Sequence, residues 1–423
     1  MKPELIRSRR TGDCCYKYRH PSGLSVYLYP KERGSATQVI FGTRYGSVDN
    51  CFQRSDESEP QTVPEGIAHY LEHKLFESEE GDAFARFASV GANANAYTGY
   101  DSTCYVFSCT DRLYESLEIL LDFVQSPYFT QETVAKERGI IAQEIKMYDD
   151  LPSWRVFSNY LRAMYHRHPV REDAAGTAES IEKITPELLY RCYHTFYNLN
   201  NMALVVAGRF DPQRVMEVCG RMLKPCPPVM VRRVFPEEPE TVVRAFVEEK
   251  LSVSMPVFQF GYKDQRGPLR SEQELAAVNV VLEVMASDAS PLFRRLLDAG
   301  LANDSSFSYQ LFEGPGFATA MFGGESRDPE AAVAMIREEA ARLARQGIER
   351  ADFERAKRSL YGDCIAALNS PASIANWLID SAFRGQDMFA YIDALVELRL
   401  EQAVKQCALF REDRSVLSVI NPC

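Results

Sequence analysis

The spacing of apolar and polar residues along the chain predicts a mixture of strands and helices. Residues 24–29 and 38–42 are short runs of β-branched, aromatic and other apolar side chains, which is typical of strands. Residues 66–76 predict a helix instead, because Ile67 and Leu71 recur about one turn apart on one side of it. The sequence therefore predicts two strands followed by a helix.

The next segments continue this mixture. Residues 95–98 and 103–107 are expected to form a hairpin, and an amphipathic helix is predicted from about residue 112. A further helix begins after Thr130, which has the position of an N-cap, and continues to about Tyr148. Strands joined by hairpins and mixed with helices indicate the α+β class, in which an antiparallel-rich sheet packs against helices.

A proline-rich segment predicts the domain organisation. Five prolines lie between residues 224 and 240, too many for the interior of a helix or strand. We expect a linker at 227–240 that separates an N-terminal domain, residues 1–226, from a second domain, residues 241–423. A chain of 423 residues is long enough for two or three domains, and one linker agrees with two.

The motif His69-Tyr70-Leu71-Glu72-His73 lies on the helix predicted over 66–76. Residues i and i+4 project from the same face of an α-helix, so the two histidines can hold one metal ion. Glu72 can reach a water on that ion without being a ligand, which is the position of the general base in a metallohydrolase. With six histidines in the whole chain, this spacing favours a metal site over two unrelated core histidines.

A third ligand must come from another segment, because a hydrolytic zinc site usually has three protein ligands and keeps the fourth position for water. Glu144 is the best candidate, and Glu137 lies two turns before it on the same face of the helix that follows Thr130. One could bind the ion while the other orients a histidine. The alternative is that both are solvated helix carboxylates.

The two predicted domains share an order of motifs, as an internal duplication would produce. The parallel segments are 70–72 with 281–283, 84–91 with 293–300, and 203–206 with 416–419. On this alignment His69 and His73 correspond to Val280 and Val284. We therefore predict two homologous domains, of which the second keeps the helix but has no metal ligands.

These motifs together resemble one peptidase family. The segments 69–73, 95–98, 137–148 and 176–181 are similar to motifs of the pitrilysin (insulinase) family of zinc peptidases, the inverzincins, which carry an inverted HxxEH motif. Within it the chain is most similar to short bacterial members that resemble mitochondrial processing peptidase, as the zinc-bearing subunit of a paired set. The resemblance covers nearly the whole chain.

The resemblance implies a zinc-dependent endopeptidase subunit acting on small or unfolded peptides, including peptides that need maturation. The implied residues are the zinc ligands His69, His73 and Glu144, the base Glu72, the supporting carboxylate Glu137, and the substrate-binding Ala94, Asn95 and Ala96. Substrate would bind as an added β-strand, because an exposed edge strand offers backbone donors and acceptors to an extended peptide.

One part of the family's pattern is missing. The resemblance implies an arginine and, seven residues later, a tyrosine from the second domain, but these positions hold Leu296 and Asn303. Neither can supply a guanidinium or a phenol, and Arg295 and Tyr309 are out of register. We therefore expect a heterodimer with a related subunit that supplies the Arg and the Tyr. The alternative is a non-proteolytic peptide-binding or assembly subunit, which the retained base Glu72 disfavours.

Composition narrows the compartment and the partners. Eleven cysteines without a CxxC pair fit reduced thiols, and a net charge of −11 argues against a nucleic-acid partner. Residues 1–10 are basic but no apolar core follows them, so no signal peptide is expected. Apolar runs such as 202–207 are too short to span a membrane. We therefore predict a cytoplasmic protein with no nucleic-acid or membrane partner.

Overall fold

The computed structural model describes residues 2–32, 34–79, 81–264, 269–303 and 305–423. Its Cα positions divide the chain into two compact units, each with its own sheet. Unit 1 consists of Met1–Ile145, Asp173–Val234 and Ile365–Phe389, and unit 2 consists of Lys146–Glu172, Phe235–Cys364 and Ala390–Cys423.

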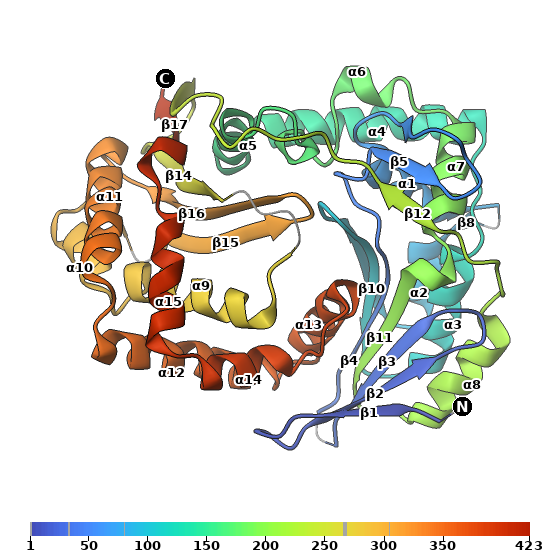
Figure 1. Cartoon of the computed structure of the whole chain (residues 1–423). Coiled ribbons are helices and arrows are strands. Elements are labelled where there is room, and N and C mark those ends of the chain that lie inside the picture. The colour runs from blue at the N-terminus through green and yellow to red at the C-terminus, as the bar shows by residue number, and fades with distance from the viewer. Residues whose placement is uncertain (1, 33, 80, 265–268, 304) are drawn as a thin grey trace. The chain divides into compact units, whose positions relative to one another are not determined.

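Unit 1 is built on a seven-stranded sheet (Figure 1). In sheet order its strands are β1 (Glu4–Arg7), β2 (Cys14–Arg19), β3 (Ser25–Pro30), β11 (Met202–Gly208), β4 (Thr37–Thr43), β10 (Thr103–Cys109) and β9 (Asn93–Thr98). β3 and β11 pair in parallel, and the other neighbours are antiparallel. Among the described residues β9 pairs with β10 alone, so it is an edge strand.

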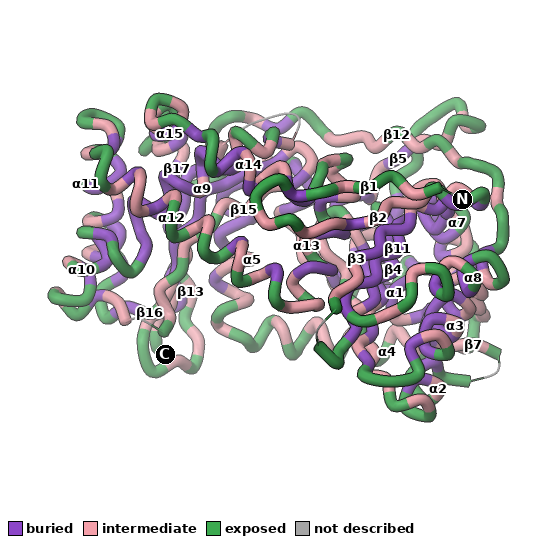
Figure 2. Tube along the Cα trace, turned by 90° about the horizontal axis from the view of Figure 1, so that it is seen from below, coloured by how far each residue is buried: buried purple, intermediate pink, exposed green. Residues whose placement is uncertain are grey.

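Helices pack against both faces of this sheet. The helices of unit 1 are α1 (Ile67–Leu75), α2 (Ala83–Ser89), α3 (Leu113–Val124), most of α4 (Gln131–Asp149), α6 (Ala178–Ile181), α7 (Pro186–Phe196), α8 (Pro212–Met222) and α13 (Pro371–Arg384). Figure 2 shows how burial concentrates on β4 and β11, and every residue of β11 is buried. The core joins Phe41 and Leu204 of the sheet to Leu71 of α1 and Leu120 of α3.

Short strands complete unit 1. β5 (Cys51–Arg54) lies between β6 (Gln61–Thr62) and β12 (Val231–Arg233) in a three-stranded sheet, and β7 (Glu77–Ser78) pairs with β8 (Gly81–Asp82) directly after α1. β12 falls inside the segment predicted as a linker, so part of that segment is a strand of unit 1.

Unit 2 is built on a five-stranded sheet. In sheet order its strands are β13 (Phe246–Leu251), β17 (Ser415–Pro422), β14 (Val257–Asp264), β16 (Phe317–Glu325) and β15 (Ser308–Gly314). Its helices are α5 (Pro152–Met164), α9 (Glu272–Ala286), α10 (Pro291–Asp298), α11 (Pro329–Gln346), most of α12 (Arg350–Ala367), α14 (Ala390–Glu397) and α15 (Leu400–Gln406). β13 and β17 pair in parallel, and the remaining neighbours are antiparallel.

The two sheets repeat one topology. The order β3-β11-β4-β10-β9 of unit 1 matches the order β13-β17-β14-β16-β15 of unit 2, with a parallel pair at the same place in each. In both units a helix follows the strand that is central in this order, α1 after β4 and α9 after β14. The predicted α+β class, with antiparallel-rich sheets packed against helices, is confirmed.

The boundary between the two compact units does not fall at one position in the chain, because each unit consists of three separate segments. The N-terminal half places α5 in unit 2, where it packs against β13, β14 and β17, and the C-terminal half places α13 in unit 1, where it packs against β4 and β11. The division into 1–226, 227–240 and 241–423 stays a prediction of where the homologous halves meet. The structure adds that each half contributes one helix to the other half's unit.

Gly42 of β4 shows how closely α13 packs on the sheet of unit 1. A Cβ atom at Gly42 would lie 3.0 Å from Cζ of Phe383 and 3.2 Å from Cδ1 of Ile379, both on α13, and 2.9 Å from Sγ of Cys104. Real Cβ atoms rarely approach other atoms so closely. The absent side chain is therefore what lets α13 lie on this face.

A buried ion pair anchors the residues that follow β12. The Nζ of Lys263 on β14 donates to Oε1 of Glu238 at 2.7 Å, and the Glu238 carboxylate also accepts three backbone N–H groups, those of residues 166–168, at 2.7–2.9 Å. Lys263 donates further to three backbone carbonyls. Both side chains are buried, so the pair holds this segment firmly in unit 2.

By length and composition, one segment of the described chain, Glu272–Asp298, is apolar enough to cross a membrane. However, 72% of its most apolar window is buried in the folded chain, as in a core helix of a water-soluble protein. A single segment of this kind is weak evidence for a membrane span.

We expect Gly42→Ala to lower the free energy of unfolding by about 1–3 kcal/mol, because the new methyl group overpacks the contact with α13. Urea unfolding followed by circular dichroism measures this change. Ile379→Val removes the Cδ1 atom and should recover part of the loss in a double variant. Gly362→Ala is the control, because its Cβ on α12 meets open space and should be neutral or stabilising. Equal effects of the two glycine variants would contradict the packing argument.

We expect Glu238→Ala to lower the free energy of unfolding by about 3–5 kcal/mol, because it leaves the buried Lys263 without its carboxylate. Burial would raise the pKa of Glu238, but hydrogen bonds from Lys263 and from backbone N–H groups hold it below its ordinary value. A depressed folded-state pKa stabilises above the unfolded-state pKa, and this stabilisation disappears as the pH falls through the folded-state value. The free energy of unfolding should therefore fall less steeply with decreasing pH in the variant than in the wild type. Asp413→Ala, which breaks an exposed pair, should change little.

Candidate metal centre

α1 is positioned by glycine at its start. Gly66 has φ +83°, and a Cβ there would lie 2.3 Å from the carbonyl oxygen of Ala175, so no other residue fits without displacing the backbone. The Ser180 hydroxyl donates to the carbonyl of Glu65 at 2.9 Å. Residues 175–180 thus hold the first turn of α1, which gives the Gly176–Ser180 motif a structural reason.

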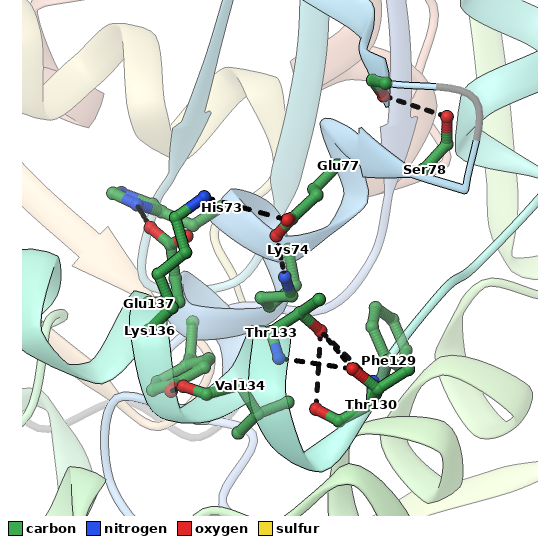
Figure 3. Close-up of polar contacts among 12 residues, drawn as sticks. His73, Lys74, Glu77, Ser78, Phe129, Thr130, Thr133, Val134, Lys136 and Glu137 are labelled. Atoms are coloured by element: carbon green, nitrogen blue, oxygen red, sulfur yellow. Dashed lines mark hydrogen bonds and ion pairs between the residues drawn. The ribbon is translucent and has the colours of Figure 1, made fainter.

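α4 begins with the predicted cap. The hydroxyl of Thr130 accepts the backbone N–H of Thr133 at 3.2 Å, as an N-cap side chain does (Figure 3). Val134 and Ile141 are the buried residues of the helix, and the hydroxyl of Tyr70 on α1 donates to the carbonyl of Val134. These contacts set α4 beside α1.

The structure brings the three predicted ligands together. One donor atom from each of His69, His73 and Glu144 lies within 4.8 Å of the others. Nε2 of His69 is 3.8 Å from Oε1 of Glu144, and Nε2 of His73 is 3.3 Å from Oε2 of the same carboxylate. The spacing of two histidines on α1 and one glutamate on α4 therefore becomes one convergent set of donors.

Glu137 supports this set from one side. Its Oε1 is 3.0 Å from Nδ1 of His73 (Figure 3). A carboxylate accepts, so Nδ1 of His73 carries a hydrogen that it donates to Glu137, and Nε2 is the ring nitrogen that faces Glu144. Between the two glutamates, the structure gives Glu144 the convergent position and Glu137 the orienting one.

The charges around the two imidazoles favour a cation. Burial and the charge of His73 lower the pKa of His69 to about 4. Burial opposes protonation of His73 too, but its hydrogen bonds to Glu137 and Glu144 raise its pKa to about 10. The carboxylates therefore stabilise positive charge between the helices, and a divalent cation would satisfy the same field.

Glu72 has an environment suited to a base. The residue is 7% exposed, and Oγ1 of Thr98 donates to its Oε2 at 2.9 Å. Burial raises the pKa of Glu72, while the hydrogen bond from Thr98 opposes that rise. A carboxylate with a raised pKa holds a proton more readily than a solvated one, as general acid–base chemistry requires.

The donor set fits zinc. Two imidazole nitrogens and one carboxylate oxygen are the ligands of hydrolytic zinc sites, which leave a fourth position open. Nδ1 of His69 is buried without a hydrogen-bond partner among the described residues, whereas Nε2 faces Glu144. Because it faces the other donors, Nε2 is the nitrogen of His69 that is positioned to coordinate an ion there.

The residues predicted to bind substrate lie on the edge strand. Ala94, Asn95 and Ala96 belong to β9, whose exposure alternates along the strand. The backbone N–H of Ala96 donates to Oδ1 of Asn95 at 2.9 Å. This N–H therefore points away from β10, and a side chain of the same strand covers one donor of the open edge.

Leu296 and Asn303 stand at the two positions where the family resemblance implies an arginine and a tyrosine. Leu296 on α10 is completely buried, and Oδ1 of Asn303 accepts from the N–H groups of Ser305 and Ser306 in a local turn. Arg295 pairs with carboxylates of α11, and Tyr309 donates to Glu283 at 2.6 Å. Within unit 2 these side chains serve local contacts.

Sequence reasoning missed two residues beside the site. Thr98 was part of a motif without a role, and its contact with Glu72 depends on the register of β9. Lys74 is completely buried and forms an ion pair with Glu77, whose other oxygen is 3.8 Å from Nζ of Lys136 on α4 (Figure 3). A lysine directly after the second histidine, within an apolar helix, was the available signal for that pair.

Comparisons with known proteins agree with this geometry. Residues 58–178 match the model of "Insulinase (Peptidase family M16)", and 183–360 match that of "Peptidase M16 inactive domain". The Bacillus subtilis "Uncharacterized zinc protease YmfH" is 39% identical over 411 residues, which covers 95% of this chain and 94% of that protein.

Solved structures of M16 peptidases are also similar to this chain. An M16-like peptidase from Alicyclobacillus acidocaldarius is 37% identical, with a TM-score of 0.93 over 97% of this chain and 98% of its own. Pitrilysin, at 15% identity and a TM-score of 0.75, shares the fold, and this chain spans 46% of its length. The chain therefore belongs to the pitrilysin (insulinase) family, peptidase family M16.

Proposed function

We propose that this chain is the zinc-bearing subunit of an endopeptidase that hydrolyses small or unfolded peptides. The observation that carries the proposal is the convergence of His69, His73 and Glu144 beside the buried carboxylate of Glu72. The zinc proteases among its relatives support the choice of metal. Maturation of a short peptide is one use that fits this activity.

In this proposal each residue has one task. His69, His73 and Glu144 hold the zinc, and Glu137 keeps Nε2 of His73 available by accepting from its Nδ1. Zinc supplies Lewis acidity, which acidifies a water and polarises a carbonyl. Glu72 accepts the proton of that water and later returns it to the leaving amine.

The substrate binds as a strand beside β9. An extended peptide finds backbone groups along this edge that pair with no other strand among the described residues, including the N–H of Ala96. A carbonyl of the peptide takes the place of Oδ1 of Asn95 on that N–H, so binding exchanges one hydrogen bond for another. Recognition through the backbone explains why the site would tolerate many side chains.

A partner completes the active site. Leu296 and Asn303 offer neither a guanidinium nor a phenol near a substrate, and their local contacts leave them no such role. A related subunit that carries the Arg and the Tyr would supply both in a heterodimer. The site of action is the cytoplasm, with no nucleic acid or membrane as partner.

A non-proteolytic peptide-binding or assembly subunit is the second candidate. The departures at Leu296 and Asn303 favour it, because they remove groups that hold the transition state. The buried base Glu72 and the convergent donors disfavour it, because peptide binding alone uses neither. Hydrolysis is therefore the function that the geometry supports best.

Glu72→Gln should leave zinc binding unchanged and lower kcat by about a hundredfold or more, because the amide cannot take a proton. The measurement combines metal analysis with cleavage of fluorogenic peptides by the chain mixed with a related subunit from the same organism that retains the Arg and the Tyr. Glu132→Gln, on the exposed first turn of α4, is the matched control.

Unchanged cleavage by Glu72→Gln would show that the assigned base is wrong. Full activity of the isolated chain would instead refute the need for a partner. Zinc binding without cleavage by any combination would favour the non-proteolytic alternative.

Glu137→Gln should weaken zinc binding by about 10- to 100-fold, because a neutral amide orients His73 less firmly than a carboxylate does. Competition with a chromogenic chelator measures the affinity directly, with no need for activity. Lys136→Gln changes the adjacent, largely exposed residue and should keep the wild-type affinity. Equal zinc affinities of Glu137→Gln and Lys136→Gln would show that Glu137 does not support the zinc site.

A further inference from the structure

Thr98, the last residue of β9, directly contacts the proposed base. Its hydroxyl donates to Oε2 of Glu72 at 2.9 Å. The two residues come from different elements, since Glu72 lies on α1 and Thr98 lies on the edge strand. A hydrogen bond from a hydroxyl to an ionised carboxylate is charge-assisted, and it is stronger than one between neutral groups.

Thr103 determines how this hydroxyl is used. It is completely buried, pairs with Thr98 in the register of β9 and β10, and donates its own hydroxyl proton to the carbonyl of Tyr45 at 2.8 Å. The oxygens of the two threonines are 3.5 Å apart. Because the Thr103 proton is committed to that carbonyl, Thr98 directs its own proton to the nearer and charged acceptor, Glu72.

Thr98 also lies on the side of β9 that is open to a peptide. The N–H of Ala96 is bonded to Oδ1 of Asn95, so it faces away from β10. Backbone groups of an antiparallel strand alternate between its two sides, so Thr98, two residues later, faces outward in the same way. One residue therefore offers its backbone to an added strand and its side chain to the base.

We propose that Thr98 is a positioning residue that couples peptide binding at β9 to the orientation of Glu72. This inference rests on the proposed peptidase function and names a further residue of the same site. Thr98 occupies Oε2 of the base, so Oε1 stays available to accept the proton of the water. A peptide paired with β9 immobilises Thr98, which holds the carboxylate in place when the scissile bond is present.

A hydrogen bond that only satisfies a buried carboxylate would behave differently. Its loss would lower the melting temperature and leave the kinetic constants of the folded enzyme unchanged. A positioning role instead predicts a loss in kcat with little change in KM, because the backbone of β9 still binds the peptide and the base is misplaced at the chemical step.

Thr98→Val and Thr98→Ser separate these readings. Valine has the shape of threonine without the hydroxyl, and serine keeps the hydroxyl. In the zinc-loaded chain with its partner subunit, we expect Thr98→Val to lower kcat by about 10- to 100-fold with KM within about twofold of wild type. Thr98→Ser should recover most of the loss. Thr110→Val, at an exposed position just beyond β10, should behave as wild type.

The zinc affinity of Thr98→Val should equal that of wild type, because the Thr98 hydroxyl donates to Glu72, which is not one of the proposed zinc ligands. A kcat within about twofold of wild type in Thr98→Val, or an equal loss in Thr98→Ser, overturns the proposal.

A thermal double-variant cycle tests the contact without any cleavage. We expect Thr98→Val to lower the melting temperature in the wild-type background and to have a smaller effect in a Glu72→Ala background, where the acceptor is gone. Equal shifts in both backgrounds overturn the proposal even if peptides are cleaved. The complex could instead bind zinc and cleave no peptide, while the two substitutions still give non-additive shifts in melting temperature. That result would refute the proposed peptidase function and leave the Thr98–Glu72 contact supported.

Discussion

The contact between His73 and Glu137 is the interaction on which the candidate metal centre depends. It decides which imidazole nitrogen faces Glu144, and it ties α1 to the helix that carries the third ligand. Together with Glu72 these residues place three carboxylates beside two imidazoles in a largely buried space. Buried anions are costly unless a cation balances them, so the packing of α1 on α4 and the affinity for a cation are two aspects of the same electrostatic constraint.

The sheet of unit 1 makes that constraint possible. α1 lies on one face and buries Leu71 and Tyr70, while the register of β9 with β10 brings Thr98 to Glu72. The opposite face accepts α13 because Gly42 has no side chain. In the proposed function, the strand that receives the substrate is also the strand whose hydroxyl orients the base. The position of Thr98 beside Glu72 is therefore set by the pairing of two strands.

The sequence predicted the parts of the site that depend on spacing within one helix. His69 and His73 share a face because of helical geometry, and Glu137 and Glu144 lie two turns apart for the same reason. The edge position of β9 came from a family resemblance, since no local pattern distinguishes an edge strand from a central one. The exchange of α5 and α13 between the units could not be predicted, because both are ordinary amphipathic helices whose partners are decided by tertiary packing.

Unit 2 shows which features of the candidate site also occur in the fold where the two histidines are absent. At the positions equivalent to His69 and His73 it has Val280 and Val284, which are buried valines of α9, yet the equivalent of Glu72, Glu283, is retained and is 7% exposed. There the hydroxyl of Tyr309 satisfies the carboxylate, as Thr98 satisfies Glu72 in the first unit. A buried glutamate bonded to a hydroxyl of an edge strand is thus compatible with the fold without a metal. What distinguishes unit 1 is the pair of imidazoles, which together with Glu144 form a candidate metal site beside the carboxylate of Glu72.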